Sequence, residues 1–330
     1  MNGDDQGSGE DRLIARLFRP LATAPGALNL SDDAAFLTPP EGYDIVLTTD
    51  AVTSGVHFFP DAPGDGVARR ALRVNLSDLA AKGARPLGFL MSVALPASVT
   101  EDWLDAFARG LAADIGEYDC PLYGGDTDRT TGPLSINIAM IGSVPKGTMV
   151  KRSGAKPGDL VLVSGTVGDA ALGVRLRGGE ADWKIAAANH EYLVERFRLP
   201  QPRLALAEAL RANASAAMDI SDGLAGDLAK LCRVSGVAAE VDVRKVPLSE
   251  AARAVLALDS SAQDSVLTGG DDYEILCTAA PEKAAALQAA AAAAKVPLTA
   301  IGTVKAGAGA RILDAAGKPM HFTHASYSHF

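Results

Sequence analysis

Aspartate recurs in this sequence at or beside the points where apolar segments end. In the clearest example, the apolar residues Ile45–Leu47 run into Thr48, Thr49 and Asp50. Threonine favours a strand and aspartate disfavours one, so this segment predicts a short buried strand with a polar end. The aspartates placed in this way are Asp33, Asp50, Asp78, Asp126, Asp219, Asp222 and Asp271. A buried carboxylate without a partner is costly, so the fold has to supply partners for these side chains or leave them in solvent.

Predicted strands and helices alternate along both halves of the chain. The first half predicts helices over 10–18, 67–82 and 100–118, the last capped by Thr100, and strands over 34–37, 44–52, 89–95 and 134–144. The second half predicts strands over 160–163, 241–243, 273–278, 298–304 and 310–313, and helices over 169–176, 191–197, 203–210, 224–232 and 284–294. The Gly- and Pro-rich segment Arg152–Asp159 indicates a boundary near residue 150. We therefore expect a mixed α/β fold of two domains, residues 1–150 and 151–330.

Composition narrows the class of protein. The 330 residues are 48% hydrophobic with a mean hydropathy of +0.12, which is enough apolar material for a sizeable core. No apolar run approaches the ~18 residues of a membrane helix, and the polar start of the chain shows no export signal, so we expect a cytoplasmic protein with no membrane partner. A net charge of −9 and a pI near 5.1 argue against a nucleic-acid partner. The separated cysteines Cys120, Cys232 and Cys277 are expected to be reduced core thiols that bind no metal.

The acidic segments predict a metal site that serves phosphates. Lysines are sparse around these segments, so a metal ion is the simplest partner for their carboxylates. Oxygen ligands from Asp, Thr and Ser suit Mg2+ or Ca2+. The sequence has no EF-hand loop, and Mg2+ held by carboxylates and water usually serves phosphates, which points to a nucleotide. It also has no Walker A lysine, no HRD or DFG motif and no GxGxxG, and Ser164–Gly168 is interpreted mainly as a turn. A nucleotide enzyme with this sequence must use another fold.

Each acidic segment also has a purely structural interpretation. Ser221–Asp222 stands where an N-cap belongs for the helix that follows it. Asp32–Asp33 can form a turn, and Gly124–Asp126 can be a glycine turn closed by an Asx hydrogen bond. Asp50 can open a loop and face solvent. Asp78 is the hardest to explain in this way, because it lies inside a predicted helix whose other faces look buried.

In their order and spacing, these segments resemble the thiamine-monophosphate kinase family. The matching segments are Ser-Asp-Asp33, Leu-Thr-Thr-Asp50, Gly-Val-His57-Phe, Asn-Leu-Ser-Asp78-Leu-Ala-Ala-Lys-Gly-Ala, Tyr-Gly-Gly-Asp126-Thr, Arg152-Ser-Gly-Ala-Lys-Pro-Gly-Asp, Asp219-Ile-Ser-Asp222-Gly-Leu and Gly-Gly-Asp271-Asp-Tyr-Glu. The resemblance extends from about residue 10 to the Tyr327–Phe330 end. The superfamily also contains aminoimidazole ribonucleotide synthetase and selenophosphate synthetase. The resemblance implies an N-terminal metal- and ATP-binding domain that forms a β-barrel across a homodimer, and a C-terminal α/β domain that completes the active-site cleft with ATP between the domains.

The resemblance also implies roles for individual residues. The matches to magnesium ligands are Asp33, Thr48, Thr49, Asp50, Asp78, Asp126, Asp219 and Asp222. Gly125, Asp126, Arg152 and Ser221 match ATP-contacting positions, and His57, Asp271 and Tyr327 match substrate-contacting positions. Two residues depart from the usual family pattern, since Ser31 stands where the family usually has Gly and Asp271 where it commonly has Glu. The turn at residue 31 and the reach of residue 271 to the substrate are therefore open.

The implied reaction is the ATP-dependent phosphorylation of thiamine monophosphate to thiamine diphosphate, with ADP released and several Mg2+ ions assisting in-line transfer. The acceptor is a phosphate monoester that is largely dianionic at neutral pH, so no side chain is expected to act as a general base. His57 is therefore expected to contact the substrate. The alternatives are the purine-synthesis cyclisation of the sister family and a non-catalytic binding module stabilised by metal.

Overall fold

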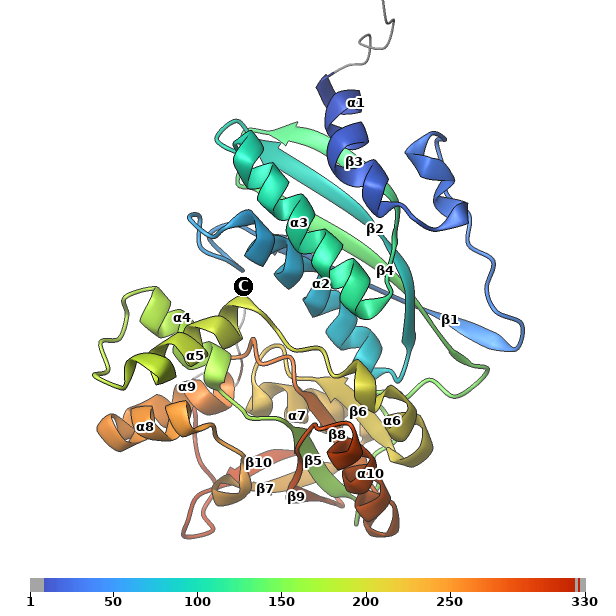
Figure 1. The fold of residues 1–330 in the computed structure, drawn as a ribbon. Helices are drawn as coiled ribbons and strands as arrows, with labels where there is room; N and C mark the ends of the chain where they lie inside the picture. The colour runs from blue at the N-terminus through green and yellow to red at the C-terminus, as the bar shows by residue number, and fades with distance from the viewer. Residues whose placement is uncertain (1–8, 324–325, 327–330) are drawn as a thin grey trace, which may run out of the picture. The chain divides into compact units, whose positions relative to one another are not determined.

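The computed structural model describes residues 9–323 and residue 326 (Figure 1). These residues form two compact units. The first unit contains the chain up to Leu76 together with Arg85–Gly147, and the second contains Ser77–Ala84 together with the chain from Thr148 onward. Helix α2, Gly64–Ala81, therefore starts in the first unit and ends in the second. A single cut near residue 150 would separate residues 77–84 from the unit to which they belong.

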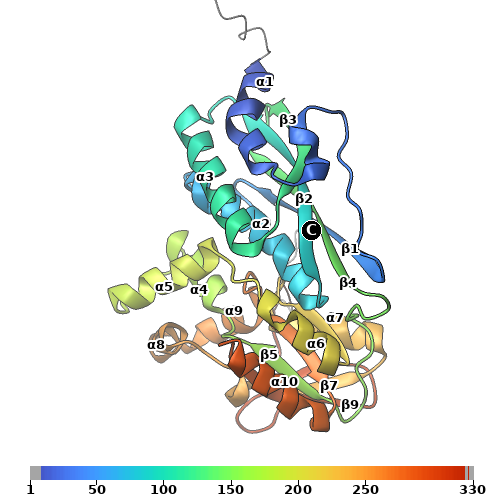
Figure 2. The same ribbon diagram turned by 45° about the vertical axis from the view of Figure 1, so that its right-hand side comes forward.

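The first unit is built on a four-stranded sheet with the strand order β1-β4-β2-β3. Its strands are β1 (Tyr43–Thr53), β2 (Arg85–Pro96), β3 (Leu122–Thr130) and β4 (Ser135–Pro145). Neighbouring strands are antiparallel except β2 and β3, which are parallel. Figures 1 and 2 show α2 and α3 (Glu101–Tyr118) against one face of this sheet. Thr100 caps α3 as predicted, because its hydroxyl oxygen accepts the Trp103 N–H at 3.2 Å.

Strand β1 confirms the strand predicted over 44–52, with one more residue at each end, but the prediction that the apolar run Ile45–Leu47 is buried is wrong. Its side chains follow the period of two that a half-buried strand requires. Val46 and Val52 are buried, whereas Ile45 and Leu47 on the alternate face are exposed. Among the described strands, β1 pairs with β4 alone, so its other edge is open in this chain. An open edge with an exposed apolar face is typical of an interface.

The N-terminal region of the first unit departs from the predicted strand at 34–37. This prediction is wrong, because the left-handed backbone of Leu28–Leu30, with φ between 49° and 56°, redirects the chain before it. The Phe36 N–H then donates to the carbonyl oxygen of Gly26 at 3.0 Å instead of joining a sheet. The helical pieces of this region are α1 (Gly9–Leu13), a π-helix (Ile14–Phe18) and 3-10 helices at Arg19–Leu21 and Pro25–Leu30. The predicted helix over 10–18 is thus α-helical in its first part and π-helical in its second.

Strand β3 contains the segment Gly124–Asp126, so the glycine-turn interpretation of that segment is wrong. Gly125 pairs with Met91 of β2 in the parallel register. A Cβ on Gly125 would lie 1.8 Å from the Met91 carbonyl oxygen. Glycine is therefore needed here for the close approach of two strands and not for a turn.

The second unit contains a six-stranded sheet with the order β10-β7-β9-β5-β8-β6. Its strands are β5 (Leu160–Ser164), β6 (Ala216–Asp219), β7 (Ala238–Asp242), β8 (Ile275–Ala279), β9 (Leu298–Lys305) and β10 (Gly309–Leu313). Neighbours are antiparallel except β7 and β10. Its helices are α4 (Asp169–Arg177), α5 (Ala187–Arg198), α6 (Ala207–Asn213), α7 (Leu224–Ser235), α8 (Glu250–Leu258), α9 (Gln263–Thr268) and α10 (Pro281–Ala293), with 3-10 helices at Leu204–Leu206, Val243–Lys245 and Ser260–Ala262. The prediction from sequence missed β6, α8 and α9.

The central strands of this sheet are apolar on both faces. Val161 and Val163 of β5 pack in one core with residues of α7, α8 and α9, whereas Leu162 packs in a second core with residues of α6 and α10. Both faces are covered, which explains why β5 appears in the sequence as a continuous apolar run. Ala80 and Ala81 belong to the second core, which places the end of α2 in this unit.

These observations confirm the expected mixed α/β class with two units. Cys120, Cys232 and Cys277 are buried free thiols. Over the part of the chain that the structure describes, no helix has both the length and the apolar character needed to cross a lipid bilayer.

Candidate functional site

Thr48–Asp50 lies within β1, because the strand continues to Thr53. The Thr49 hydroxyl donates to the Ile138 carbonyl oxygen of β4 at 3.0 Å, so this hydroxyl is used within the sheet. The Asp50 N–H donates to the side-chain oxygen of Asn75, a buried residue of α2, at 2.9 Å. This contact fixes the backbone of Asp50 while the residue stays exposed.

His57 follows β1 in a tight turn. Its N–H donates to the Thr53 carbonyl oxygen at 2.8 Å, and its Nδ1 accepts the Thr53 N–H at 3.0 Å. A ring nitrogen that accepts an N–H carries no proton, so the neutral imidazole is protonated at Nε2. At neutral pH, Nε2 of His57 is therefore a hydrogen-bond donor.

Three predicted site residues, Asp33, Gly125 and Asp126, line one cavity of about 550 Å³ in the first unit. All three are exposed. The cavity also has apolar and small walls, contributed by Ile14, Phe18, Ala27, Leu90, Met91 and Tyr123. Ser31 adopts φ −114°, a backbone conformation open to any residue, so its presence in place of glycine causes no strain in the turn before Asp33.

Asp219 lies within the electrostatic influence of Asp78 in the second unit. Asp219 is buried at the end of β6, and its Oδ2 accepts a hydrogen bond from Ser77 Oγ at 2.7 Å. Burial, and then the nearby charge of Asp78, raise the pKa of Asp219 to about 8. Two carboxylates held together in this way favour a shared proton or a cation.

Lys82 brings positive charge to the same place, although the prediction from sequence gave it no role. Its Nζ donates to the Ala217 carbonyl oxygen at 2.8 Å. Burial lowers the pKa of Lys82, the charge of Asp219 opposes this, and the charge of Arg152 lowers it further. Arg152, predicted to contact ATP, thus lies near enough to act on Lys82. Asp78, Arg152 and Asp219 are therefore brought together.

Ser221 and Asp222 form a turn before α7, but they do not cap it. The helix begins at Leu224 with Gly223 as its N-cap and without a side-chain cap, so the capping interpretation is wrong. Asp227 of α7 instead accepts the N–H groups of Ser221 and Asp222 at 3.0 and 2.9 Å. The helix side chain therefore shapes the turn.

Asp271 lies in a strained segment that joins the Ser221 turn. Gly270, Asp271 and Tyr273 all have positive φ, a conformation that costs energy in residues with a side chain. The Asp271 N–H donates to the Ser221 carbonyl oxygen at 2.9 Å, and Tyr273 N–H donates to Ile220 O at the same distance. A predicted substrate contact and a predicted ATP contact are thus linked directly by backbone.

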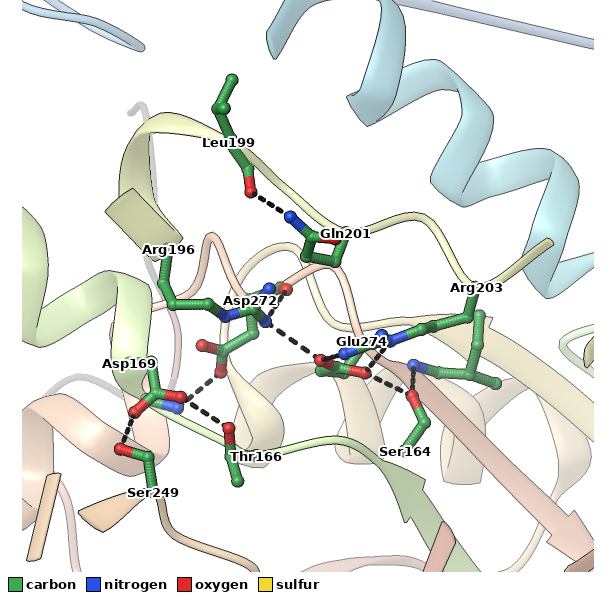
Figure 3. Close-up of polar contacts among 12 residues, drawn as sticks. Ser164, Thr166, Asp169, Arg196, Leu199, Gln201, Arg203, Ser249, Asp272 and Glu274 are labelled. Carbon is green, nitrogen blue, oxygen red and sulfur yellow. Dashed lines mark hydrogen bonds and ion pairs between the residues drawn. The ribbon is translucent and has the colours of Figure 1, made fainter. Parts of the chain in front are cut away.

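Glu274 is a buried residue directly after this strained segment, and Figure 3 shows its polar contacts. Its fully buried carboxylate accepts Arg196 Nη2 at 3.0 Å, Arg203 Nε at 2.7 Å and the Ser164 hydroxyl at 2.5 Å. Arg203 also contacts it through Nη2. Arg196 makes a further bond to the carbonyl oxygen of Asp272 at 3.3 Å. Glu274 stands inside a predicted motif, but its partners Arg196 and Arg203 lie 78 and 71 residues earlier and gave no signal in the sequence.

The Ser164–Gly168 segment is a structural turn, as interpreted from sequence. Its N–H groups are already used, because Gly165 donates to Pro297 O at 2.9 Å and Val167 donates to Pro247 O at 3.0 Å. The Gly168 N–H donates to Oδ2 of Asp272 at 2.7 Å. These amides therefore do not form a phosphate cradle.

The predicted metal ligands are divided between the two units. The first unit contains Asp33, Thr48, Thr49, Asp50 and Asp126, and the second contains Asp78, Asp219 and Asp222. Within residues 9–323 and 326, no group of three or more His, Cys, Asp or Glu side chains is arranged to hold a metal ion. The donor chemistry nevertheless fits Mg2+, because the Asp78 and Asp219 carboxylates and the Ser77 hydroxyl are hard oxygen donors and a cation would relieve the repulsion. Tyr327 lies outside the described residues.

Comparison with known proteins identifies the family. The family models described as AIR synthase related protein, N-terminal and C-terminal domains, match residues 31–144 and 156–314. The thiamine-monophosphate kinase of Caulobacter vibrioides is 44% identical over 300 residues, which cover 90% of this chain and 84% of the relative. The chain belongs to the thiamine-monophosphate kinase family.

Solved structures agree with this membership. The crystal structure of thiamine-monophosphate kinase from Stenotrophomonas maltophilia K279a is 40% identical with a TM-score of 0.83, over 96% of this chain and 98% of that chain. The structure of AaThiL complexed with AMPPCP and TMP is 28% identical with a TM-score of 0.77, over 97% of this chain and 94% of that chain. The family fold therefore extends over both units.

Proposed function

We propose that this protein transfers the terminal phosphoryl group of ATP to thiamine monophosphate and releases thiamine diphosphate and ADP. Membership of the kinase family, with 44% identity to a thiamine-monophosphate kinase over 90% of the chain, carries the proposal. The AaThiL relative is a complex with AMPPCP and TMP, which supports ATP and thiamine monophosphate as the ligands here. The ATP contacts we propose are Gly125, Asp126, Arg152 and Ser221, and the substrate contacts are His57, Asp271 and Tyr327.

Several Mg2+ ions are the proposed cofactor. Their ligands would come from Asp33, Thr48, Thr49, Asp50, Asp78, Asp126, Asp219 and Asp222. When bound, Mg2+ offsets the repulsion between two phosphate-bearing substrates. Ser77 supports this role by donating a hydrogen bond to Asp219, which orients one oxygen of that carboxylate. Arg152 would add fixed positive charge in the same region, and Lys82 would add positive charge when it is protonated.

No residue is needed as a general base, because the acceptor phosphate is already largely dianionic at neutral pH. The hydrogen bonds of His57 support this mechanism. Its Nδ1 is occupied by the Thr53 N–H, so Nε2 of the neutral ring can donate a hydrogen bond but cannot accept a proton. We infer that His57 orients the substrate. Positioning for in-line attack then supplies most of the remaining rate.

We also propose a homodimer in which β1 contributes to an intersubunit barrel. The exposed apolar side chains of β1, Tyr43, Ile45 and Leu47, and its open edge support this. Light scattering on the intact protein should give a dimer mass. Leu47→Asp should shift that mass towards the monomer, whereas a fully active wild-type monomer would contradict the proposal.

One assay tests the function. Purified protein is mixed with ATP, Mg2+ and thiamine monophosphate, and ADP release is followed by a coupled enzyme reaction. The expected result is ADP release that depends on thiamine monophosphate and stops with a chelator. Consumption of ATP only with a formylglycinamidine substrate would instead indicate the sister cyclisation, and no ADP release with any small phosphate would indicate a binding module.

A further inference from the structure

Two side chains of α7, Asp227 and Lys230, hold the turn that carries Ser221 and Asp222. Asp227 is fully buried, and its Oδ2 accepts the N–H groups of Ser221 and Asp222 at 3.0 and 2.9 Å. Two charge-assisted hydrogen bonds to adjacent amides fix the backbone conformation of the turn. The direction of the Asp222 side chain is thereby set from inside the helix.

Lys230 connects the two carboxylates. Its Nζ lies 2.9 Å from Asp227 Oδ1 and forms an ion pair and hydrogen bond with Asp222 Oδ2. The Lys230 side chain is 27% exposed and that of Asp222 is 35% exposed, so the ion pair between them faces solvent. The ion pair of Lys230 with Asp227 instead has a buried acidic partner. A carboxylate predicted to bind metal is therefore already paired with a cation from its own chain.

We propose that Lys230 competes with Mg2+ for the Asp222 carboxylate and so raises the Mg2+ concentration at which this carboxylate is occupied by metal. The inference rests on the proposed role of Asp222 as a magnesium ligand. A dication near Asp222 would repel the ammonium group, and the ammonium group occupies one of the oxygens that the dication needs. Lys230 is thus a residue that tunes metal binding.

The two bonds of Lys230 are expected to respond differently when metal arrives. Asp227 lies three residues before Lys230 on α7 and has no exposed surface, so separating it from its cation would leave a buried charge. The Asp222 pair is partly exposed, and losing such a pair costs little. Lys230 therefore releases Asp222 and keeps Asp227, which preserves the turn while freeing the metal ligand.

The test measures metal binding without turnover. Nucleotide-free wild-type protein and Lys230→Met are titrated with Mn2+, the loss of the free-ion EPR signal gives the dissociation constant, and Mg2+ is then added to displace Mn2+. We expect Lys230→Met to bind both ions about fivefold more tightly, the factor that a partly exposed ion pair is worth. Lys230→Arg keeps the charge and should bind within about twofold of wild type. Lys305→Met removes an exposed lysine of β9 and should leave the dissociation constant unchanged.

Lys230→Gln is the second variant if Lys230→Met melts early, because its amide can still donate to Asp227. Equal or weaker metal binding in the folded neutral variant would overturn the inference, and so would a wild-type protein that takes up no Mn2+. Asp222→Asn separates this result from the proposed function. If Asp222→Asn binds metal like wild type, the ligand role of Asp222 fails, whereas the assay of ADP release judges the kinase activity independently.

Discussion

The predicted metal-ligand aspartates of the first unit and a group of buried acids in the second unit are held in opposite ways. In the first unit, Asp33, Asp50 and Asp126 are exposed on a cavity wall or on the sheet surface. In the second unit, four acids are instead buried and accept hydrogen bonds from hydroxyls, backbone N–H groups, lysine or arginine. These buried acids are Asp219, Asp227, Asp272 and Glu274. An exposed carboxylate can gain or lose an external cation at little cost to the fold, whereas a buried one contributes to stability.

The difference separates two meanings of an acidic motif. Asp126 directly follows a glycine pair and Glu274 stands four residues after one, but Asp126 lines a cavity whereas Glu274 joins two arginines to a sheet. We therefore expect substitutions of Asp33, Asp50 and Asp126 to change activity more than stability. Substitutions of the buried acids should change stability as well.

The largest effect should come from Glu274→Gln. This variant keeps the shape of the side chain but removes the buried carboxylate that pairs with Arg196 and Arg203, so the free energy of unfolding should fall by about 3–5 kcal/mol. Urea denaturation followed by circular dichroism measures the change. Glu240→Gln is the control, because Glu240 and Arg311 are 3.8 Å apart and exposed. A loss below about 1 kcal/mol for Glu274→Gln would contradict the claim that the buried acids of the second unit contribute to stability.

Asp126→Asn should separate activity from stability. Asp126 is a proposed Mg2+ ligand, and losing one anionic ligand of a metal ion that serves the phosphates should lower kcat/KM for ATP by about 10²–10³-fold. Because Asp126 is exposed, the free energy of unfolding should stay within about 0.5 kcal/mol of wild type. Steady-state kinetics and urea denaturation of the same preparation give both values. Wild-type turnover would remove Asp126 from the site.

Asp272→Asn should change how stability depends on pH. Burial, and then the charges of Asp169 and Glu274 against the opposing Gly168 N–H and Arg196, raise the pKa of Asp272 well above its usual 3.8. A raised pKa means that the folded protein keeps a proton that the unfolded chain releases. The resulting stability is complete below about pH 4 and is lost as pH rises, by up to ~1.4 kcal/mol per pH unit.

The asparagine variant cannot lose that proton, so its free energy of unfolding should fall less than that of wild type between pH 5 and pH 8. Denaturation at each pH measures the difference. The exposed substitution Asp264→Asn controls for the change in net charge. Parallel curves for wild type and Asp272→Asn would show that Asp272 is ionised in the folded protein.

His57→Ala should have the smallest effect. A residue that donates a hydrogen bond to the substrate should mainly raise KM for thiamine monophosphate, with kcat within about tenfold of wild type. Initial rates at varied thiamine monophosphate give both constants. A loss of several orders of magnitude in kcat at unchanged KM would instead make His57 catalytic and would require a base in the mechanism.

The sequence predicted elements better than partners. The strand over 44–52 and the cap at Thr100 follow from local patterns, and both are confirmed, whereas the burial of Ile45 and Leu47 was predicted wrongly because it depends on what covers the strand. Gly125 misled the prediction because glycine is a local turn signal, whereas its role here depends on the Met91 backbone of another strand. The remaining predicted site residues stay predictions, apart from the proximities described above.

Burial of acids was the hardest property to predict. Asp78 was the hardest aspartate to explain from the sequence. In the structure burial, and then the charge of Asp78, raise the pKa of Asp219, which lies far along the chain. Glu274 depends on Arg203, about 70 residues away, and no local pattern reports such a pair. The contact of Lys230 with Asp227 spans three residues of one helix, so helical spacing could have revealed it.

The division of α2 has a consequence for exchanging parts between relatives. A fragment of residues 151–330 would lack Ala80 and Ala81 from its core, the Ser77 hydroxyl on Asp219 and the Lys82 ammonium on Ala217. A chimera that replaces the second unit must therefore also carry the short segment Ser77–Ala84, which needs crossovers on both sides of it. The chain folds as two units, but a chimera made with a single crossover cannot take either unit complete from one parent.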